Sequence, residues 1–237
     1  MSSIQEVQDE IVSEFEILGD DKESTIYYIM ELGGSLEDFP DSERIESSTI
    51  KGCQSKVWLI AEEKDGKVHF QADSNTDITK GLISLLLRVL NYRSPEEIIN
   101  AELNFVERIG MGSIIGSQRS NGFASMIKQI KLYALAIQVD NLKEKVIQAI
   151  KLVYDPEIPV DVYDLGLIYE ITVYPVNNVY ILMTLTSPNC PSAEFIPSEV
   201  KDKIQQIQGI NNVEIELTFD PPYSQDMMSE AAKLELG

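Results

Sequence analysis

A β-hairpin is predicted by the stretch Lys56-Val57-Trp58-Leu59-Ile60-Ala61-Glu62-Glu63-Lys64-Asp65-Gly66-Lys67-Val68-His69-Phe70-Gln71-Ala72. Residues 56–62 and 67–72 are rich in apolar and β-branched side chains, which indicates two short strands. Asp65-Gly66 lies between them and is a dipeptide typical of a tight turn. Cys53 comes just before the first of these strands.

Helices are predicted on both sides of this hairpin. Apolar residues recur at helical spacing over residues 4–18, 26–32 and 78–90,. Ser94-Pro95-Glu96-Glu97 combines a cap residue, a proline in the first turn and two acids, which is typical of a helix start. A longer helix is predicted over residues 121–137. Helices that accompany a small sheet indicate the α+β class.

The pattern restarts after Gln138. Residues 141–153 predict a helix capped by Asn141, and the residues that follow predict strands over 167–174, 179–185 and 213–219 and helices over 191–207 and 227–236,. With 237 residues the chain is long for one domain,. We therefore expect two α+β domains, residues 1–138 and 139–237, each a small, mostly antiparallel sheet packed with helices. A short polar linker is expected at residues 138–140.

Acidic residues dominate the composition. Asp and Glu number 39 against 19 Lys and Arg, a net charge of -20. Such a charge repels phosphate backbones, so we expect no nucleic-acid partner. The longest apolar stretches fall well short of the roughly 20 residues that span a bilayer, and the first fifteen residues are acidic, unlike a signal peptide. We expect a cytoplasmic protein without a membrane partner, whose two cysteines, Cys53 and Cys190, stay reduced.

The chemistry open to Cys53 has two interpretations. Gly52 gives the backbone freedom, and the ammonium groups of Lys51 and Lys56 would favour the thiolate that a reactive cysteine requires. From the residues alone, however, a lone cysteine beside a strand is more often a small core residue.

The first half resembles the SufE family over about residues 4–137. Four motifs carry the resemblance, in order and spacing: Gly52-Cys53-Gln54-Ser55-Lys56-Val57-Trp58, Asp73-Ser74, Lys80-Gly81-Leu82 and Ser117-Gln118-Arg119-Ser120-Asn121-Gly122. The resemblance implies that Cys53 accepts sulfur as a persulfide from a SufS-type cysteine desulfurase, activates that enzyme and passes the sulfur on, without a cofactor. It also implies supporting roles for Gln54, Asp73, Ser74 and Arg119. For the last three, a cap or a structural ion pair is an equally good explanation.

The second half resembles the SufT/PaaD family over about residues 141–237. The motifs are Asp155-Pro156-Glu157-Ile158-Pro159, Asp164-Leu165-Gly166-Leu167, Thr184-Leu185-Thr186-Ser187-Pro188-Asn189-Cys190-Pro191 and Asp220-Pro221-Pro222 with Met227-Met228-Ser229-Glu230. Tyr223 and Asn189 stand where the family commonly has Trp and Gly. The resemblance implies a role in the maturation of iron-sulfur proteins.

Cys190 falls at the predicted start of a helix. Unpaired backbone N–H groups there favour a thiolate, so we expect a thiol modestly more acidic than the ~8.5 of free cysteine. A buried structural cysteine is the alternative. The pocket of this thiol would be lined by residues of the same motifs, Asp155, Glu157, Asp164, Thr186 and Glu194. Alternatively, Asp155 and Asp164 cap turns and Glu194 complements the helix start. Cys190 is also the candidate ligand for iron or a cluster at a dimer interface, since one thiolate per chain cannot hold a cluster.

Both resemblances indicate iron-sulfur cluster biogenesis. The predicted function is that of an accessory, sulfurtransferase-like protein that takes persulfide sulfur from the desulfurase on Cys53 and assists cluster assembly or delivery with a Suf scaffold as partner. Sulfur acceptance itself needs no cofactor, while a transient iron ion or cluster at the second domain stays open. The alternatives are a non-catalytic adaptor that docks assembly proteins and a cluster carrier through Cys190.

Overall fold

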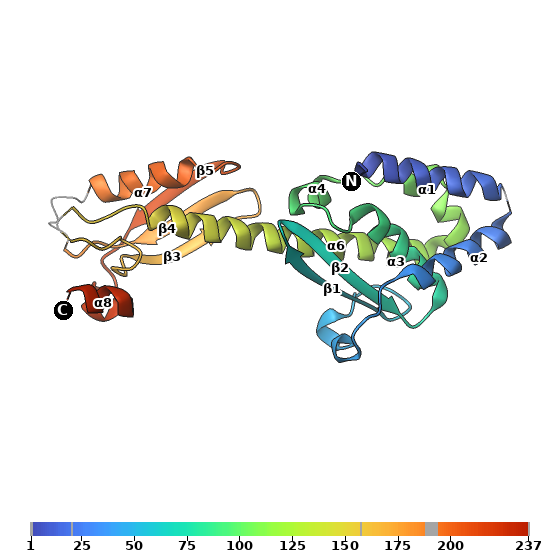
Figure 1. Cartoon of the computed structure of the whole chain (residues 1–237), viewed down its shortest axis with the longest axis horizontal. Coiled ribbons are helices and arrows are strands. Elements are labelled where there is room, and N and C mark those ends of the chain that lie inside the picture. Colours follow the sequence, from blue (N-terminus) through green and yellow to red (C-terminus); the bar gives the residue numbers. More distant parts are fainter. Residues whose placement is uncertain (1, 20, 157, 188–193, 237) are drawn as a thin grey trace. The chain divides into compact units, whose positions relative to one another are not determined.

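The computed structural model describes residues 2–19, 21–156, 158–187 and 194–236. The chain forms two compact units, residues 1–137 and 138–237 (Figure 1). Each unit contains helices and one small sheet, so the predicted α+β class is confirmed.

The hairpin of the first unit consists of β1 (Val57–Lys64) and β2 (Lys67–Ser74). The two strands pair antiparallel from Val57↔Ser74 to Lys64↔Lys67. Asp65 and Gly66 both have positive φ, 52° and 74°, as the tight turn between two hairpin strands requires,. The turn chemistry therefore sets the register of this sheet.

Six helices accompany this hairpin among the described residues: α1 (Ile4–Leu18), α2 (Lys22–Leu32), α3 (Asp77–Leu90), α4 (Pro95–Asn100), α5 (Phe105–Arg108) and the first part of α6 (Met111–Ile150). Ser3 and Ser94 open α1 and α4 with capping boxes,. Three short 3-10 turns, Gly33–Ser35, Asp41–Glu43 and Glu46–Ser48, connect α2 to β1.

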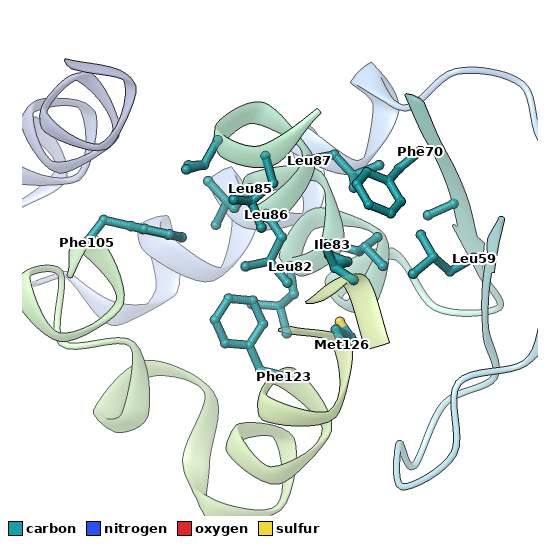
Figure 2. Packing of buried hydrophobic residues seen from close by; sticks show 14 of the residues in the cluster. Leu59, Phe70, Leu82, Ile83, Leu85, Leu86, Leu87, Phe105, Phe123 and Met126 are labelled. Carbon is teal, nitrogen blue, oxygen red and sulfur yellow. The ribbon is translucent and has the colours of Figure 1, made fainter. Parts of the chain in front are cut away.

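The core of the first unit is built around α3. Figure 2 shows Ile83 of this helix between the strand residues Leu59 and Phe70 and the α6 residue Met126, with Leu82 on the side of the α6 residue Phe123. Helix α2 packs against another side of α3, at a contact so close that a Cβ on Gly81 would lie 1.6 Å from the carbonyl oxygen of Ile29. The first turn of α3 follows directly on β2, which brings it near the Cys53 loop.

The linker expected at residues 138–140 is absent. Helix α6 continues from Met111 to Ile150, so the predicted helix end at Ile137 and the cap at Asn141 are wrong. The chain has no glycine or proline between Gly122 and Pro156. Polar residues such as Gln138 and Asp140 do not end a helix unless a glycine or proline accompanies them, so α6 continues through residues 138–140,. Its one non-helical residue is Gly116, with φ 77°.

The sheet of the second unit has the order β3-β4-β5, formed by β3 (Ile168–Val173), β4 (Asn178–Met183) and β5 (Asn212–Leu217). The β3–β4 pair is antiparallel, whereas β4 and β5 are parallel. A parallel pair needs a long crossover, and the segment with α7 (Phe195–Gln205) provides it,. The chain ends in a 3-10 turn (Gln225–Met227) and α8 (Glu230–Leu236). Among the described residues, no helix combines the length and apolar character needed to cross a bilayer.

Candidate functional site

Cys53 lies in the loop between the 3-10 turn Glu46–Ser48 and β1, and it is partly buried. Its thiol donates a hydrogen bond to the carbonyl oxygen of Gly122 in α6, with 3.4 Å between sulfur and oxygen. A Cβ at Gly122 would come within 3.5 Å of the Cys53 sulfur. The glycine therefore keeps space open beside the sulfur while its backbone holds the thiol.

The resting Cys53 is a neutral thiol. Burial raises its pKa, because a thiolate removed from water loses hydration. Lys51 forms an ion pair with Glu46 instead, and both Lys51 and Lys56 are exposed to solvent. The expected activation of the thiol by these two lysines is therefore wrong.

A cavity of about 90 Å³ adjoins Cys53. The core residues Leu82 and Met126, labelled in Figure 2, form part of its apolar wall. Gln54 and Arg119 also line it, and both are largely exposed. The structure thus brings two of the predicted supporting residues to the space beside the sulfur.

Asp73 and Ser74 brace the strand pair from which the cysteine loop emerges. Asp73 binds Arg44, with 2.7 Å between Oδ2 and Nη2, and Lys80, with 3.1 Å between Oδ1 and Nζ. Burial works to raise the pKa of Asp73, but the hydrogen bonds from Arg44 and Lys80 outweigh it and lower the pKa,. The Ser74 hydroxyl donates to the carbonyl oxygen of Lys56 at 2.8 Å. The Ser74 contact ties the end of β2 to the residue before β1, whereas Asp73 ties β2 to Arg44 after the second 3-10 turn and to Lys80 in α3.

In the second unit, Asp164 lies in a small charged cluster. Its carboxylate is 3.2 Å from Lys151 Nζ. Burial works to raise the pKa of Asp164, yet hydrogen bonds from Lys151 and Asp161 outweigh it and lower the pKa, whereas burial raises the pKa of Asp161. Asp161 also caps the turn, accepting from the backbone N–H groups of Tyr163 and Asp164 at 3.0 and 2.9 Å.

Thr186 and Glu194 are exposed and flank the segment 188–193. Glu194 occupies the N-cap position of α7 but makes no side-chain cap hydrogen bond. Cys190 lies in that segment, outside the described residues, so its acidity, its pocket and its metal binding stay predictions. In the part of the chain that the structure describes, no group of three or more His, Cys, Asp or Glu side chains is arranged to hold a metal ion.

Two family models match the chain. The SufE model, described as an Fe-S metabolism associated domain, matches residues 9–134. A second model, described as an iron-sulfur cluster assembly protein, matches residues 143–217. The chain belongs to the SufE family, with a second domain from the iron-sulfur cluster assembly proteins.

Relatives match stretches about as long as one of these domains. An Fe-S protein maturation auxiliary factor of Porphyromonas gingivalis is 52% identical over 95 residues, which cover 40% of this chain and 90% of that protein. An uncharacterized SufE-like protein of Synechocystis sp. is 35% identical over 107 residues, which cover 45% of this chain and 67% of that protein. A crystal structure of a domain of unknown function from Bacillus anthracis is 37% identical, with a TM-score of 0.41, and covers 43% of this chain and 97% of that one.

Some contacts of Cys53 in the SufE domain were not indicated by the sequence. Gly122 closes one motif, but nothing in the sequence indicates that its carbonyl meets Cys53. Thr76 and Thr79 also line the cavity. Their spacing of three residues at a helix start indicates a shared face, and it is the one signal that points to them.

Proposed function

We propose that Cys53 of the SufE domain accepts one sulfur atom as a persulfide from a SufS-type cysteine desulfurase. The sulfur would pass on to a Suf assembly scaffold, and the second domain would assist cluster assembly or delivery. The observation that carries the proposal is the cavity of about 90 Å³ beside the partly buried Cys53 sulfur. An accessory role in iron-sulfur biogenesis is the broader statement that both family matches support.

The transfer is a thiol exchange without net oxidation. The Cys53 thiolate attacks the outer sulfur of the donor persulfide, R–S–SH, and forms the new S–S bond. The old S–S bond breaks, and the donor cysteine leaves as a thiolate with the electron pair. Cys53 must first lose the proton that it shares with the Gly122 carbonyl. Because burial raises the pKa of Cys53, this ionisation is a barrier that contact with the desulfurase has to lower.

The cavity suits the product of this step. A persulfide extends one atom beyond the cysteine sulfur, and that atom is open to attack by any thiol in solution. A space of about 90 Å³, walled in part by Leu82 and Met126, has room for one sulfur atom and shields it from larger reductants. A cysteine that only fills a core needs no such space beside it.

The proposal is tested by incubating the full chain with a SufS-type desulfurase and cysteine, followed by mass spectrometry of the intact protein. We expect a gain of the mass of one sulfur atom in the wild type and in Cys190→Ser, and no gain in Cys53→Ser. Serine is nearly isosteric but cannot form a persulfide. An active desulfurase that leaves the wild type unmodified would exclude sulfur acceptance and favour the adaptor alternative.

The second domain is tested separately. Covalent linkage holds it near the SufE domain at an effective concentration that can reach the millimolar range. We expect the full chain to speed transfer of a cluster to an apoprotein more than an equimolar mixture of its separated halves does. Equal rates for the two samples would contradict a benefit from joining the domains.

A further inference from the structure

Three hydroxyl groups form a closed hydrogen-bonded ring beside Cys53. Thr76 donates to Thr79 at 2.8 Å, Thr79 donates to Ser55 at 3.2 Å, and the Ser55 and Thr76 oxygens are 2.9 Å apart. Each hydroxyl carries a single hydrogen. Since the hydrogen of Thr76 is already used, Ser55 must donate to Thr76. All three residues line the cavity that adjoins the Cys53 sulfur.

Local structure does not account for this ring. Thr76 occupies the N-cap position of α3, where a threonine side chain ordinarily accepts a hydrogen bond from the first helical turn. Here it makes no side-chain cap hydrogen bond. Its hydroxyl bonds to the Thr79 hydroxyl instead, and Thr79 is only 5% exposed. The start of α3 therefore lacks the side-chain cap that would stabilise it, and the three hydroxyl groups lie at the cavity instead.

An anionic sulfur in this cavity requires hydrogen-bond donors. The neutral Cys53 thiol is satisfied by the Gly122 carbonyl, but a carbonyl oxygen repels the sulfur once the proton has gone. Among the described residues that line the cavity, Arg119 is the one with a charged side chain, and it is exposed. Among these described lining residues, Thr79 is the one with a buried polar side chain, at 5% exposure, and its hydroxyl is the buried donor available to the cavity.

We propose that Thr79 turns its hydroxyl from Ser55 to the anionic sulfur on Cys53 and stabilises it, first as thiolate and then as persulfide. The persulfide part rests on the proposed function, whereas the thiolate part does not. The Thr79–Ser55 hydrogen bond is the longest of the three at 3.2 Å, so it is the weakest and the easiest to break. Breaking it leaves the chain Ser55→Thr76→Thr79→sulfur, in which each hydrogen bond polarises the next.

Thr79→Val tests the proposal because valine keeps the shape and removes the hydroxyl. In the full chain with Cys190→Ser, the rate of iodoacetamide alkylation of Cys53 is measured against pH. We expect the midpoint to rise by about one pH unit, a roughly tenfold loss of thiolate below the midpoint. Thr79→Ser should restore the wild-type midpoint. Thr76→Val, which only shortens the polarising chain, should raise it by about half as much.

Thr25→Val is the matched control. Thr25 is also 5% exposed, and its hydroxyl donates to the carbonyl oxygen of Asp21, the N-cap residue of α2, neither of which lines the cavity. Its loss should leave the midpoint unchanged. An unchanged or lowered midpoint in Thr79→Val, or a shift in Thr79→Ser as large as in Thr79→Val, would overturn the proposal. If Thr79→Val does not fold, an unchanged midpoint in Thr76→Val overturns it.

The titration needs no desulfurase, so it separates the two proposals. If the wild-type protein takes no sulfur from the desulfurase, the proposed function is refuted. The alkylation midpoints still test the role of Thr79 in that case. Conversely, if the wild type forms the persulfide but Thr79→Val leaves the alkylation midpoint unshifted, only the proposed role of Thr79 is refuted.

Discussion

Gly122→Ala is expected to stabilise the SufE domain while it impairs sulfur acceptance by Cys53. Gly122 lies within α6, and glycine inside a helix is about 0.8–1.0 kcal/mol less favourable than alanine,. An alanine Cβ would meet the Sγ and Cα atoms of Cys53 at 3.5 Å and its Cβ at 3.7 Å. These are ordinary van der Waals distances, so no atom has to move. Helix propensity therefore decides whether the substitution raises or lowers the free energy of unfolding.

The expected gain is therefore close to 1 kcal/mol, which corresponds to about 4 °C in the melting temperature of a domain of this size. The same methyl group stands beside the sulfur and takes space that the outer persulfide sulfur requires. We expect the yield of persulfide under limiting desulfurase to fall severalfold, although the protein is more stable.

Trp58 makes the stability assay specific for the SufE domain. It is the single tryptophan of the chain and lies on β1, so its fluorescence during urea unfolding reports on the SufE domain. Gly112→Ala is the control, because Gly112 is also in α6 and a Cβ built there has nothing within 4 Å. The control should keep the wild-type persulfide yield. A Gly122→Ala protein that is less stable than the wild type, or that matches the control in yield, would refute the reasoning.

Cys53 should react with iodoacetamide with a midpoint above the ~8.5 of a free thiol, because burial raises its pKa,; a midpoint at or below that value in Cys190→Ser protein would contradict this. Asp73→Asn should lower the free energy of unfolding by about 1–2 kcal/mol at neutral pH, since the amide removes the negative charge from two ion pairs and replaces one acceptor oxygen with an NH2 group,. The folded pKa of Asp73 is lowered, so its contribution is present above the unfolded pKa of ~3.9 and is lost as the pH falls through the folded value,. The difference in urea unfolding between Asp73→Asn and wild type should therefore shrink on acidification, and a difference that is constant with pH speaks against the ion pairs. Gly166→Ala should destabilise the second domain by about 3 kcal/mol or more, because φ is 76° and the new Cβ would lie 2.3 Å from the Met227 carbonyl oxygen,; unchanged hydrogen-exchange protection in that domain would count against this close contact.

Local features were predictable from the sequence because neighbouring residues determine them. The Asp65-Gly66 turn supplies the positive φ values that a hairpin needs, and Ser94 to Glu97 supplies both halves of a capping box,. Apolar periodicity indicated the helix and strand types in both halves, and the motif around Cys53 indicated the family. None of these inferences required knowledge of what lies across the core.

The tertiary structure decided how long α6 is and how the second sheet pairs. Gln138 and Asp140 are polar, which favoured a linker at residues 138–140, yet the helix has no glycine or proline there and continues,. Each strand of the second sheet was predictable, but the parallel pairing of β4 with β5 depends on the path of the crossover,.

The state of Cys53 was also decided by distant residues. Lys51 and Lys56 are its neighbours in sequence, but their charged groups lie in water, where attraction to a thiolate is weak,. The carbonyl that accepts the thiol hydrogen belongs to Gly122, 69 positions further along the chain, and the hydroxyls of Thr76 and Thr79 arrive on the first turn of α3. A pKa depends on burial and on distances through space, and only the packing of α3 and α6 around the loop determines those.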